Sequence, residues 1–418
     1  MDESVLDKLK ILAESAKYDV SCASSGTPRG HKAGAIGSAA GWGICHSFAE
    51  DGRCISLLKI MLTNYCRYDC AYCINRRSND IPRATLSVTE LVNLTIEFYR
   101  RNYIEGLFLS SGVVRNPDYT MERLVRIVKD LRTIHRFNGY IHLKGIPGAS
   151  PELIHEAGLY ADRMSVNIEI PNEKSLQTLA PEKDFQSVFT PMRHIQQGVL
   201  ESAEERKKYR SAPRFAPAGQ STQMIIGATP DSDKDILRLS SALYQRPTMK
   251  RVYYSGFVPV NAYDNRLPQL KQPPLVRENR LYQADWLLRF YQFKVDEIVD
   301  DSYPDLDLEI DPKLAWALRH PEKFPVDINR ADYELLLRIP GLGVKSAKMI
   351  IVSRRYGKIN GSQLKKMGVV LKKAQYFITC NELPLQTVQE LRPERVRQLL
   401  IPRKGKQEDP RQLKIIFE

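Results

Sequence analysis

The chain has 418 residues, 43% of them hydrophobic, which is enough for one large α/β domain plus a small module. A membrane span requires about 18 consecutive apolar residues, and the sequence has no apolar stretch of that length. The N-terminus lacks the features of a signal peptide. We therefore expect a cytoplasmic protein with no membrane partner. The net charge of +13 favours polyanionic partners, and the odd count of 7 cysteines argues against a disulfide framework.

The first 50 residues are expected to form a Gly-rich N-terminal extension, with a helix at about residues 4–17. The segment that follows this helix, CASSGTPRGHKAGAIGSAAGWG, is dominated by Gly, Ser and Ala. Two interpretations stay open for it: a flexible extension, or an ordered lid over the mouth of an active site.

Residues 51–300 alternate between strand-like runs and stretches with apolar residues at helical spacing, such as MERLVRIVKDLRTIH. The predicted strands are 56–62, 105–111, 140–146, 163–170, 222–228 and 251–257. Such alternation implies a parallel sheet with right-handed crossovers. The six units predict an α/β fold with an open, three-quarter β/α barrel, in which the chemistry lies at the C-terminal ends of the strands.

Three cysteines follow the first predicted strand directly, in the segment MLTNYCRYDCAYCINRR. Cys66, Cys70 and Cys73 have the spacing C-x3-C-x2-C, and a tight loop can bring their thiolates round one metal centre. A structural zinc site would need a fourth ligand, and no His or Cys follows at the usual spacing. A four-iron cluster held by three thiolates leaves one iron open. The alternatives are a zinc-stabilised loop and unrelated thiols.

This cysteine loop, placed after strand one of a β/α array, resembles the signature of the radical S-adenosylmethionine (SAM) superfamily. The resemblance implies a [4Fe-4S] cluster whose open iron binds SAM, and reductive cleavage of SAM to a 5′-deoxyadenosyl radical. Tyr72 matches the aromatic position that packs on the SAM adenine. Ser110, Ser111 and Gly112 end the second predicted strand, where the family has a short turn that contacts the SAM amino group. The resemblance also implies a partial barrel of the radical SAM type and an electron donor such as flavodoxin or ferredoxin.

Further SAM-binding residues are predicted on the fourth and fifth strands. Ser165, Asn167 and Glu169 alternate along RMSVNIEI, so they point to one face of the strand and into the lumen of a barrel. There they can bind a ribose or a carboxylate. Gly227 on the fifth strand can admit the ligand, although a packing role is equally compatible. Lys144 ends the third strand and is interpreted as a solvated lysine, and no residue is assigned as catalytic.

The C-terminal part divides into an acidic, Pro-containing linker at 301–325, a small all-α module at 326–381 and a tail at 382–418. The module contains the turn Pro340-Gly341-Leu342-Gly343 between helices predicted at 330–338, with Asn329 as the N-cap, and 344–354.

This turn resembles the helix–hairpin–helix motif of nucleic-acid-binding proteins. Gly341 and Gly343 permit the sharp turn and let backbone N–H groups approach a phosphate, which Lys345 and Lys348 would reinforce. A second helix–turn–helix outline follows around Gly368, with valine in place of the second glycine, and is expected mainly to brace the first.

Charge supports a nucleic-acid partner for this module. Nine Lys and Arg residues lie between Gly341 and Asn381, uninterrupted by Asp or Glu. Such a face is an electrostatic footprint for backbone phosphates and binds with little sequence preference. A protein-binding module with a solvated basic face is the alternative.

The pairing of the cysteine loop with this module, together with the Gly-rich start and SLLKIMLTNYCRYDCAYCINRR, resembles the group of radical SAM proteins described as acting in DNA modification or repair. The resemblance implies a DNA nucleotide as the substrate class and a uracil-DNA-glycosylase-like partner. A base inside a duplex would have to be flipped out or already unpaired to reach a barrel lumen. The alternatives are a radical SAM enzyme that modifies RNA, and a non-catalytic DNA-binding iron–sulfur protein that senses redox state.

Overall fold

The structure is a computed structural model that describes residues 3–17, 44–48, 54–381, 383 and 387–401. The chain divides into two compact units, of which unit 1 comprises residues 1–230 and 242–273 and unit 2 comprises residues 231–241 and 274–418. Most of the Gly-rich segment and the end of the C-terminal tail lie outside the described residues. The domain boundaries expected from the sequence stay predictions.

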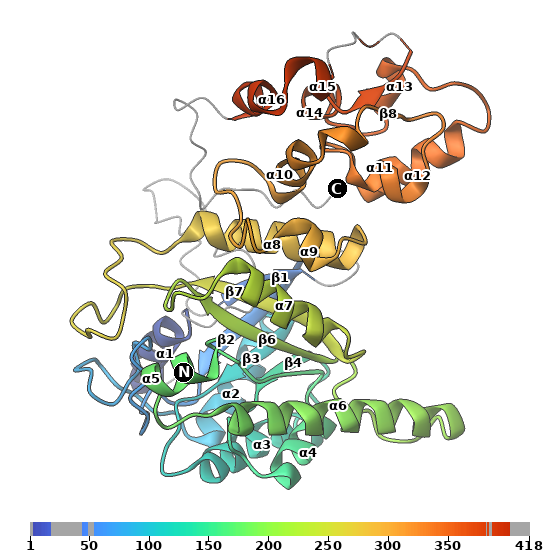
Figure 1. Cartoon of the computed structure of the whole chain (residues 1–418). Helices are drawn as coiled ribbons and strands as arrows, with labels where there is room; N and C mark the ends of the chain where they lie inside the picture. Colours follow the sequence, from blue (N-terminus) through green and yellow to red (C-terminus); the bar gives the residue numbers. More distant parts are fainter. Residues whose placement is uncertain (1–2, 18–43, 49–53, 382, 384–386, 402–418) are drawn as a thin grey trace, which may run out of the picture. The chain divides into compact units, whose positions relative to one another are not determined.

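Unit 1 is built on a seven-stranded sheet whose strands follow one another in chain order from β1 to β7 (Figure 1). Neighbours from β2 to β7 pair in parallel, and β1 pairs antiparallel with β2. The strands are β1 (Ile44–Phe48), β2 (Cys54–Met61), β3 (Gly106–Ser110), β4 (Tyr140–Lys144), β5 (Arg163–Ser165), β6 (Gln220–Ile226) and β7 (Met249–Gly256). Because β1 and β7 do not pair, the sheet stays an open, partial barrel.

Helices in unit 1 connect the parallel strands, and α2, α3, α4 and α6 pack side by side in that order along the sheet (Figure 1). Its helices are α1 (Glu3–Ala16), α2 (Val88–Arg100), α3 (Pro117–Thr133), α4 (Pro151–Tyr160), α5 (Glu173–Leu179) and α6 (Phe185–Lys208). The start of α2 shows why a helix begins there. Ser87 accepts a hydrogen bond from the Glu90 amide, and the Glu90 carboxylate accepts one from the Ser87 amide, which forms a capping box.

Each of the six predicted strands overlaps one of the parallel strands β2 to β7. All five residues of β3 are buried, as expected for a parallel strand that is covered on both faces. The predicted α/β fold class and open, partial β/α barrel are therefore confirmed. β1 was not predicted, because it lies in the segment read as an extension.

The fourth strand is shorter than predicted, since β5 ends at Ser165 and not near Ile170. The Thr222 hydroxyl donates to the Val166 carbonyl and accepts from the Ile168 amide, so a side chain replaces the strand ladder there. Glu169 then adopts a positive φ of 65°, which turns the backbone out of the extended conformation.

Unit 2 is mostly helical, with one short parallel pair of strands, β8 (Val326–Asp327) and β9 (Ile378–Thr379). Its longer helices are α8 (Leu275–Phe290), α10 (Pro312–Arg319), α12 (Val344–Ser353) and α16 (Pro393–Leu400). Its shorter helices are α9 (Val295–Ile298), the 3-10 helix η1 (Pro321–Lys323), α11 (Tyr333–Arg338), α13 (Gly361–Lys366), α14 (Leu371–Ala374) and α15 (Val388–Leu391). Most of α7 (Asp233–Tyr244) also belongs to this unit.

Two hairpins lie side by side in unit 2. The first hairpin joins α11 to α12 and the second joins α13 to α14. Gly341 in the first and Gly368 in the second both have a φ of 82°, a conformation that favours glycine. The Val370 amide donates to the Gly341 carbonyl at 2.8 Å, and the Ser346 hydroxyl donates to the Met367 carbonyl at 2.8 Å. Each hairpin therefore supports the other.

The predicted N-cap of α11 is wrong. Asp332 caps this helix by accepting from the Leu335 amide at 2.7 Å. Asn329 instead donates to the Ile359 carbonyl and accepts from the Ile359 amide. It thereby joins the segment before α11 to the segment between α12 and α13.

No helix in the described part of the chain is long and apolar enough to cross a bilayer.

Candidate functional site

A pocket opens at the carboxyl ends of the parallel strands in unit 1. Its empty space is about 1120 Å³, part of which is open to solvent. The polar and thiol side chains that line it are those of Ser15, Cys66, Tyr68, Cys70, Tyr72, Cys73, Asn75, Ser111, Lys144, Asn167, Glu169, Lys183, Gln223 and Ser255. All three cysteines of the loop after β2 therefore reach one pocket, as do Ser111 and Gly112 after β3.

The cysteine loop is fixed against the turn after β3. The Gly112 amide donates to the Thr63 carbonyl, the Arg67 amide donates to the Val113 carbonyl, and the Val113 amide points at Cys66 Sγ at 3.4 Å. A side chain at Gly112 would place its Cβ 2.3 Å from the Tyr65 carbonyl oxygen. Close approach of the two backbones is thus the physical reason for a glycine at this turn.

A buried arginine ties the cysteine loop to the segment after β7. Arg76 is only 5% exposed and forms a two-pronged ion pair with Asp69, at 3.0 and 2.7 Å. Its remaining nitrogen contacts Asp264 at 2.7 Å. The hydrogen bonds from Arg76 hold the pKa of Asp69 well below its usual range, and those from Arg266 do the same for Asp264.

Amide and guanidinium groups brace the rest of the loop. Asn261, almost fully buried, donates to the Ala71 and Cys73 carbonyls at 2.7 and 3.0 Å. The Asn79 side chain donates to the Asn261 side-chain oxygen at 2.8 Å. Arg83 donates to the carbonyls of residues 64, 75, 76 and 79. The path of the loop is therefore set by buried polar contacts as well as by its own sequence.

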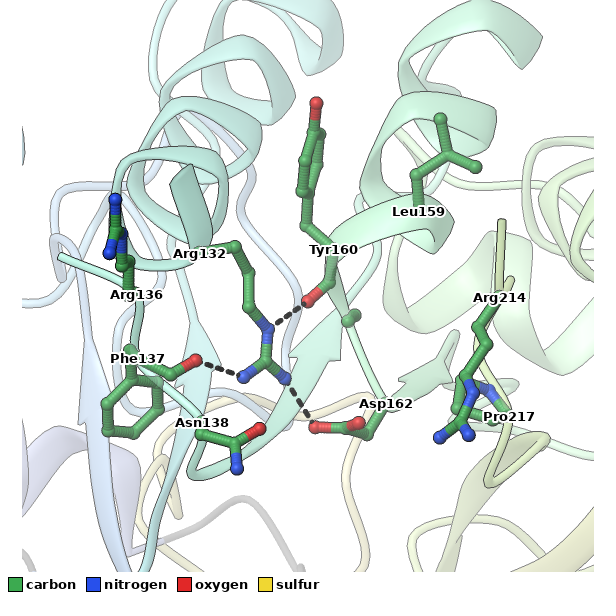
Figure 2. A pocket seen from close by; sticks show the side chains of 10 residues that line it. Arg132, Arg136, Phe137, Asn138, Leu159, Tyr160, Asp162, Arg214 and Pro217 are labelled. Atoms are coloured by element: carbon green, nitrogen blue, oxygen red, sulfur yellow. Dashed lines mark hydrogen bonds and ion pairs between the residues drawn. The ribbon is translucent and has the colours of Figure 1, made fainter. Parts of the chain in front are cut away.

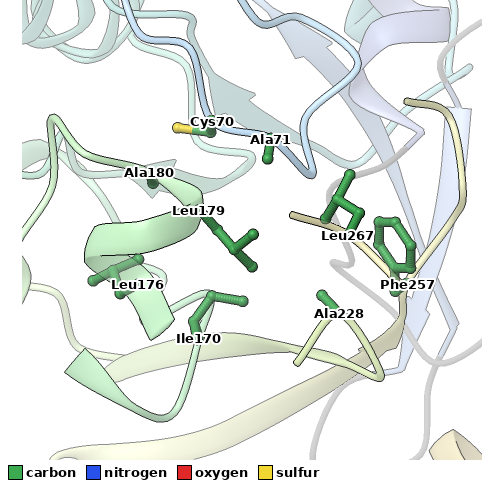
Figure 3. Packing of buried hydrophobic residues seen from close by; sticks show 9 residues of the cluster. All are labelled: Cys70, Ala71, Ile170, Leu176, Leu179, Ala180, Ala228, Phe257 and Leu267. Atoms are coloured by element: carbon green, nitrogen blue, oxygen red, sulfur yellow. The ribbon is translucent and has the colours of Figure 1, made fainter. Parts of the chain in front are cut away.

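Apolar side chains close the pocket on the side of Cys70. Figure 3 shows Cys70 and Ala71 of the cysteine loop with Leu176, Leu179 and Ala180 of α5 and its end, and with Phe257 and Leu267 of the segment after β7. Burial raises the pKa of the Cys70 thiol and raises that of Cys73 to about 12. Without an electrophilic partner these two sulfurs are therefore protonated at neutral pH, and a bound metal centre has to displace the protons.

A partly buried cation faces the same pocket. The Lys183 ammonium lies 3.5 Å from the Tyr72 hydroxyl. Burial alone would lower the pKa of Lys183, but the facing Cys70, Tyr72 and Glu169 outweigh it and raise the pKa well above the usual value. Glu169 also lies 4.0 Å from the Lys144 ammonium. The pocket thus presents both signs of charge to a bound molecule, as an amino acid zwitterion requires.

Most of the predicted site residues come together here. The pocket lining includes Tyr72, Ser111, Gly112, Asn167 and Glu169. Three other predicted residues are outside the lining. Ser110 is buried in the sheet, Ser165 contacts His142 at 3.0 Å deeper in the barrel, and Gly227 has a φ of 85° in the turn after β6.

Sequence reasoning missed Lys183 and Gln223, which also line the pocket. Lys183 follows α5, outside any predicted strand, so no pattern marked it. Gln223 lies on β6, where its 3.3 Å hydrogen bond from Asn167 could have been found only by pairing the two strands. Lys144 lines the pocket too, although a solvated role was expected.

A second pocket in unit 1 contains the guanidinium group of Arg132, whose contacts are structural. Figure 2 shows Arg132 donating to the carbonyls of Phe137 and Tyr160 and forming an ion pair with Asp162 at 2.6 Å. It also donates to the Gly139 carbonyl. Arg132 therefore satisfies carbonyls in the loop between α3 and β4 and at the end of α4, near the amino ends of the strands and away from the cysteine loop.

The donor set of the first pocket fits an iron–sulfur cluster. Three cysteines outside any disulfide line one pocket. Within the described ranges, no three His, Cys, Asp or Glu side chains form a group that holds a single metal ion. A cluster differs from a single ion because each thiolate binds a different iron. Cys66, Cys70 and Cys73 would hold three irons of such a cluster and leave the fourth without a thiolate from this loop.

Comparison with known proteins agrees with this assignment. The sequence model of the radical SAM superfamily matches residues 60–211. A search of curated proteins gave no match.

Solved structures that resemble the chain include the FeFe-hydrogenase maturase HydG from Carboxydothermus hydrogenoformans, at 11% identity and a TM-score of 0.43, covering 81% of this chain and 74% of that one. Coproporphyrinogen III oxidase (HemN) from Escherichia coli, a radical SAM enzyme, has 14% identity and a TM-score of 0.34, covering 62% of this chain and 56% of that one. Methylornithine synthase (PylB) has 14% identity and a TM-score of 0.40, covering 55% of this chain and 61% of that one. Likeness at this level does not identify a shared reaction.

The matched region begins in β2 and contains the whole cysteine loop. Enzymes of the superfamily use a [4Fe-4S] cluster with SAM and need an electron donor. Residues 60–211 thus form a domain of the radical SAM superfamily, and the chain is an enzyme that contains this domain.

Proposed function

We propose that this enzyme directs radical chemistry to a nucleotide within DNA, for repair or modification. The observation that carries the proposal is the basic double hairpin of unit 2 in the same chain as the cysteine pocket of unit 1. The hairpins supply a surface for a phosphate backbone, and the pocket supplies the reaction. The helix–hairpin–helix assignment and the four predicted DNA-binding residues, Gly341, Gly343, Lys345 and Lys348, are part of this proposal.

The first hairpin offers unpaired backbone donors to a phosphate. Gly343 is the N-cap of α12 and has no side chain to accept from the first helical amides. The first amides of this ten-residue helix have no acceptor within the helix, and exposed Lys345 and Lys348 lie in its first two turns. Behind the turn, buried Lys313 donates to the Leu342 carbonyl at 2.6 Å, which fixes the orientation of the hairpin.

Most of the basic residues in this region face solvent. Arg354 is used internally, because it donates to the carbonyls of residues 328 and 331, and Lys373 pairs with Asp311 at 2.7 Å. The exposed cations are Lys345, Lys348, Arg355, Lys358, Lys365, Lys366 and Lys372. A surface of this kind gains affinity for nucleic acid by releasing counterions from the phosphates.

In unit 1 the chain's own residues would position the reactants. When bound, the cluster and SAM supply one-electron cleavage of SAM and thus radical chemistry. Cys66, Cys70 and Cys73 would hold the cluster. Tyr72 would pack on the adenine, and the turn at Ser111 and Gly112 would contact the amino group of SAM. Asn167 and Glu169 would contact its ribose or amino acid moiety, and the apolar wall behind Cys70 excludes water from that side.

Binding and cleavage measurements test this division of labour. Fluorescence anisotropy with duplex DNA, single-stranded DNA and structured RNA is expected to show tighter binding to DNA for the intact chain. Lys345→Glu with Lys348→Glu should weaken that binding by at least tenfold, since two phosphate contacts become repulsive. Arg238→Glu with Arg395→Glu makes the same charge change on other helices of unit 2 and should have a smaller effect.

Two outcomes would overturn the proposal. Preference for structured RNA would make the enzyme an RNA-modifying one. Equal losses of DNA binding in the two pairs of variants would mean that general charge, and not the hairpin, attracts DNA. Co-purification separately tests the expected electron donor and the uracil-DNA-glycosylase-like partner.

A further inference from the structure

A cluster of arginine and tyrosine side chains lies next to residues that line the cysteine pocket. We call it the rim, and it consists of Tyr65, Arg67, Arg115, Tyr119 and Arg123. Tyr65 and Arg67 flank Cys66 in sequence, and Arg115 follows the pocket-lining Val113 by two positions. Tyr119 and Arg123 lie on the first turns of α3. All five residues therefore stand at the carboxyl edge of the sheet, in unit 1.

Four of the rim residues contact one another directly, and the fifth, Tyr65, has the Arg83 guanidinium at 5.9 Å from its ring centre. The Arg67 guanidinium donates to the Arg115 carbonyl. The Arg115 guanidinium stacks on the Tyr119 ring at 4.5 Å from its centre, and Arg123 donates to the Tyr119 hydroxyl at 3.3 Å. Arg115 also has a φ of 58°, which is uncommon for a residue other than glycine. The backbone here is held in an unusual conformation that presents the Arg115 side chain beside Tyr119.

The charge of the rim is not neutralised. Among the described residues, none of its three arginines forms an ion pair with a carboxylate, and Arg67 and Arg115 are exposed. Two guanidinium groups lie over the Tyr119 ring, and the third is bonded to the Arg115 carbonyl. Gathering these charges costs electrostatic free energy unless an anion binds there. Guanidinium groups match phosphate oxygens in a two-pronged geometry, so a phosphate is the anion that this arrangement fits.

We infer that the rim binds the sugar–phosphate backbone of a DNA strand and so presents a nucleotide to the pocket. This inference rests on the proposed function, and it adds a DNA contact within the catalytic barrel itself. Aromatic side chains favour nucleic acid over an acidic protein as the occupant. Tyr65 is 50% exposed beside Cys66, and a base that leaves the stack can pack on such a ring. Arginine next to an exposed aromatic ring is the pattern of surfaces that bind unpaired nucleotides.

The test removes two rim charges from the full-length chain. Arg67→Gln with Arg115→Gln should weaken binding to single-stranded DNA by about tenfold at moderate salt. It should also reduce the slope of log affinity against log salt concentration by about 0.7 per lost contact. Arg100→Gln with Arg101→Gln is the matched control, because both residues are exposed at the far end of α2, where β3 begins. The control pair should bind as the wild type does.

A second double variant separates loss of charge from loss of folding, because Arg67 also donates a hydrogen bond to the Arg115 carbonyl. Arg115→Gln with Arg123→Gln leaves that bond in place and should give the same loss of affinity, with an unchanged melting temperature. Tyr65→Phe should keep the affinity and Tyr65→Ala should lower it, because only the ring is needed for stacking.

Three results would overturn the inference. The first is that the rim variants bind DNA with the affinity and salt slope of the control pair. The second is that they bind DNA normally but are no longer reduced by an acidic flavodoxin, which would make the rim a docking surface for the electron donor. The third is that the wild type binds no DNA, in which case the proposed function fails as well. Loss of DNA binding only in Lys345→Glu with Lys348→Glu leaves the proposed function intact and refutes the rim alone.

Discussion

Replacing Arg76 should loosen the cysteine loop more than any other single change outside the cysteines. Three charge-assisted hydrogen bonds join Arg76 to Asp69 and Asp264, and all three groups are largely buried. Arg76→Gln leaves Asp69 without its main partner, whereas Asp264 keeps Arg266 at 2.6 Å. Removing one partner of such a pair costs about 3–5 kcal/mol. We expect a loss of that size in the free energy of unfolding of unit 1.

The pH dependence of stability gives this prediction a sign. In the folded wild type the pKa of Asp69 lies below the ordinary value of 3.8, because Arg76 stabilises the carboxylate. The unfolded chain therefore binds a proton at a higher pH than the folded chain does. The contribution of the pair is complete above about pH 5 and is lost as the pH falls through and below 3.8. Arg76→Gln should remove this acid-sensitive part of the stability.

The assay combines unfolding with cluster content. Urea denaturation between pH 3 and pH 7 measures the free energy of unfolding, and iron analysis after anaerobic reconstitution measures how well the loop holds its cluster. Arg76→Lys keeps the positive charge but loses the planar guanidinium group that binds Asp69 in two places. Its free energy of unfolding and iron content should lie between those of the wild type and Arg76→Gln. Asp69→Asn with Arg76→Gln should cost less than the sum of the single changes. The reasoning is refuted if Arg76→Gln unfolds within about 1 kcal/mol of the wild type and retains a full complement of iron.

Four further changes have defined outcomes. Gly112→Ala should displace the cysteine loop, because its Cβ would lie 2.3 Å from the Tyr65 carbonyl oxygen, and iron content should fall with little change in helix content by circular dichroism. Cys70→Ala should abolish cluster absorbance and 5′-deoxyadenosine formation together; retention of either would contradict the ligand assignment. Lys345→Glu with Lys348→Glu should weaken DNA binding while 5′-deoxyadenosine formation without DNA stays near wild type. Burial lowers the pKa of Lys313 to about 7, so stability of the wild type should rise with pH between about 7 and 10.5, and Lys313→Met should flatten that rise in calorimetry.

The sequence was sufficient for the parts of the fold that depend on local pattern. The parallel strands are short apolar runs between amphipathic helices, and each was placed within a few residues. The cysteine loop was predicted because its spacing and its position after a strand are both local. β5 was predicted to be too long because the Thr222 hydroxyl, 54 positions away from Ile168, replaces the backbone hydrogen bonds of the strand there. No local pattern carries that information.

The contacts that build the site were harder to predict for the same reason. Lys183 reaches Tyr72 across 111 positions of sequence, and Arg76 reaches Asp264 across 188. Charged residues in loops normally lie in solvent, so their burial follows only from the fold. Ser110 illustrates the opposite error. It was grouped with Ser111 by sequence, but successive residues of a strand point to opposite faces, and only Ser111 lines the pocket.

Nucleoside mass spectrometry of DNA treated with the reduced, cluster-loaded enzyme and SAM tests the central claim most directly. The account predicts that one nucleoside of the DNA changes, that this change requires SAM and a reductant, and that Cys70→Ala abolishes it. Formation of 5′-deoxyadenosine with every DNA nucleoside unchanged, or with a changed nucleoside only in RNA, would contradict the account.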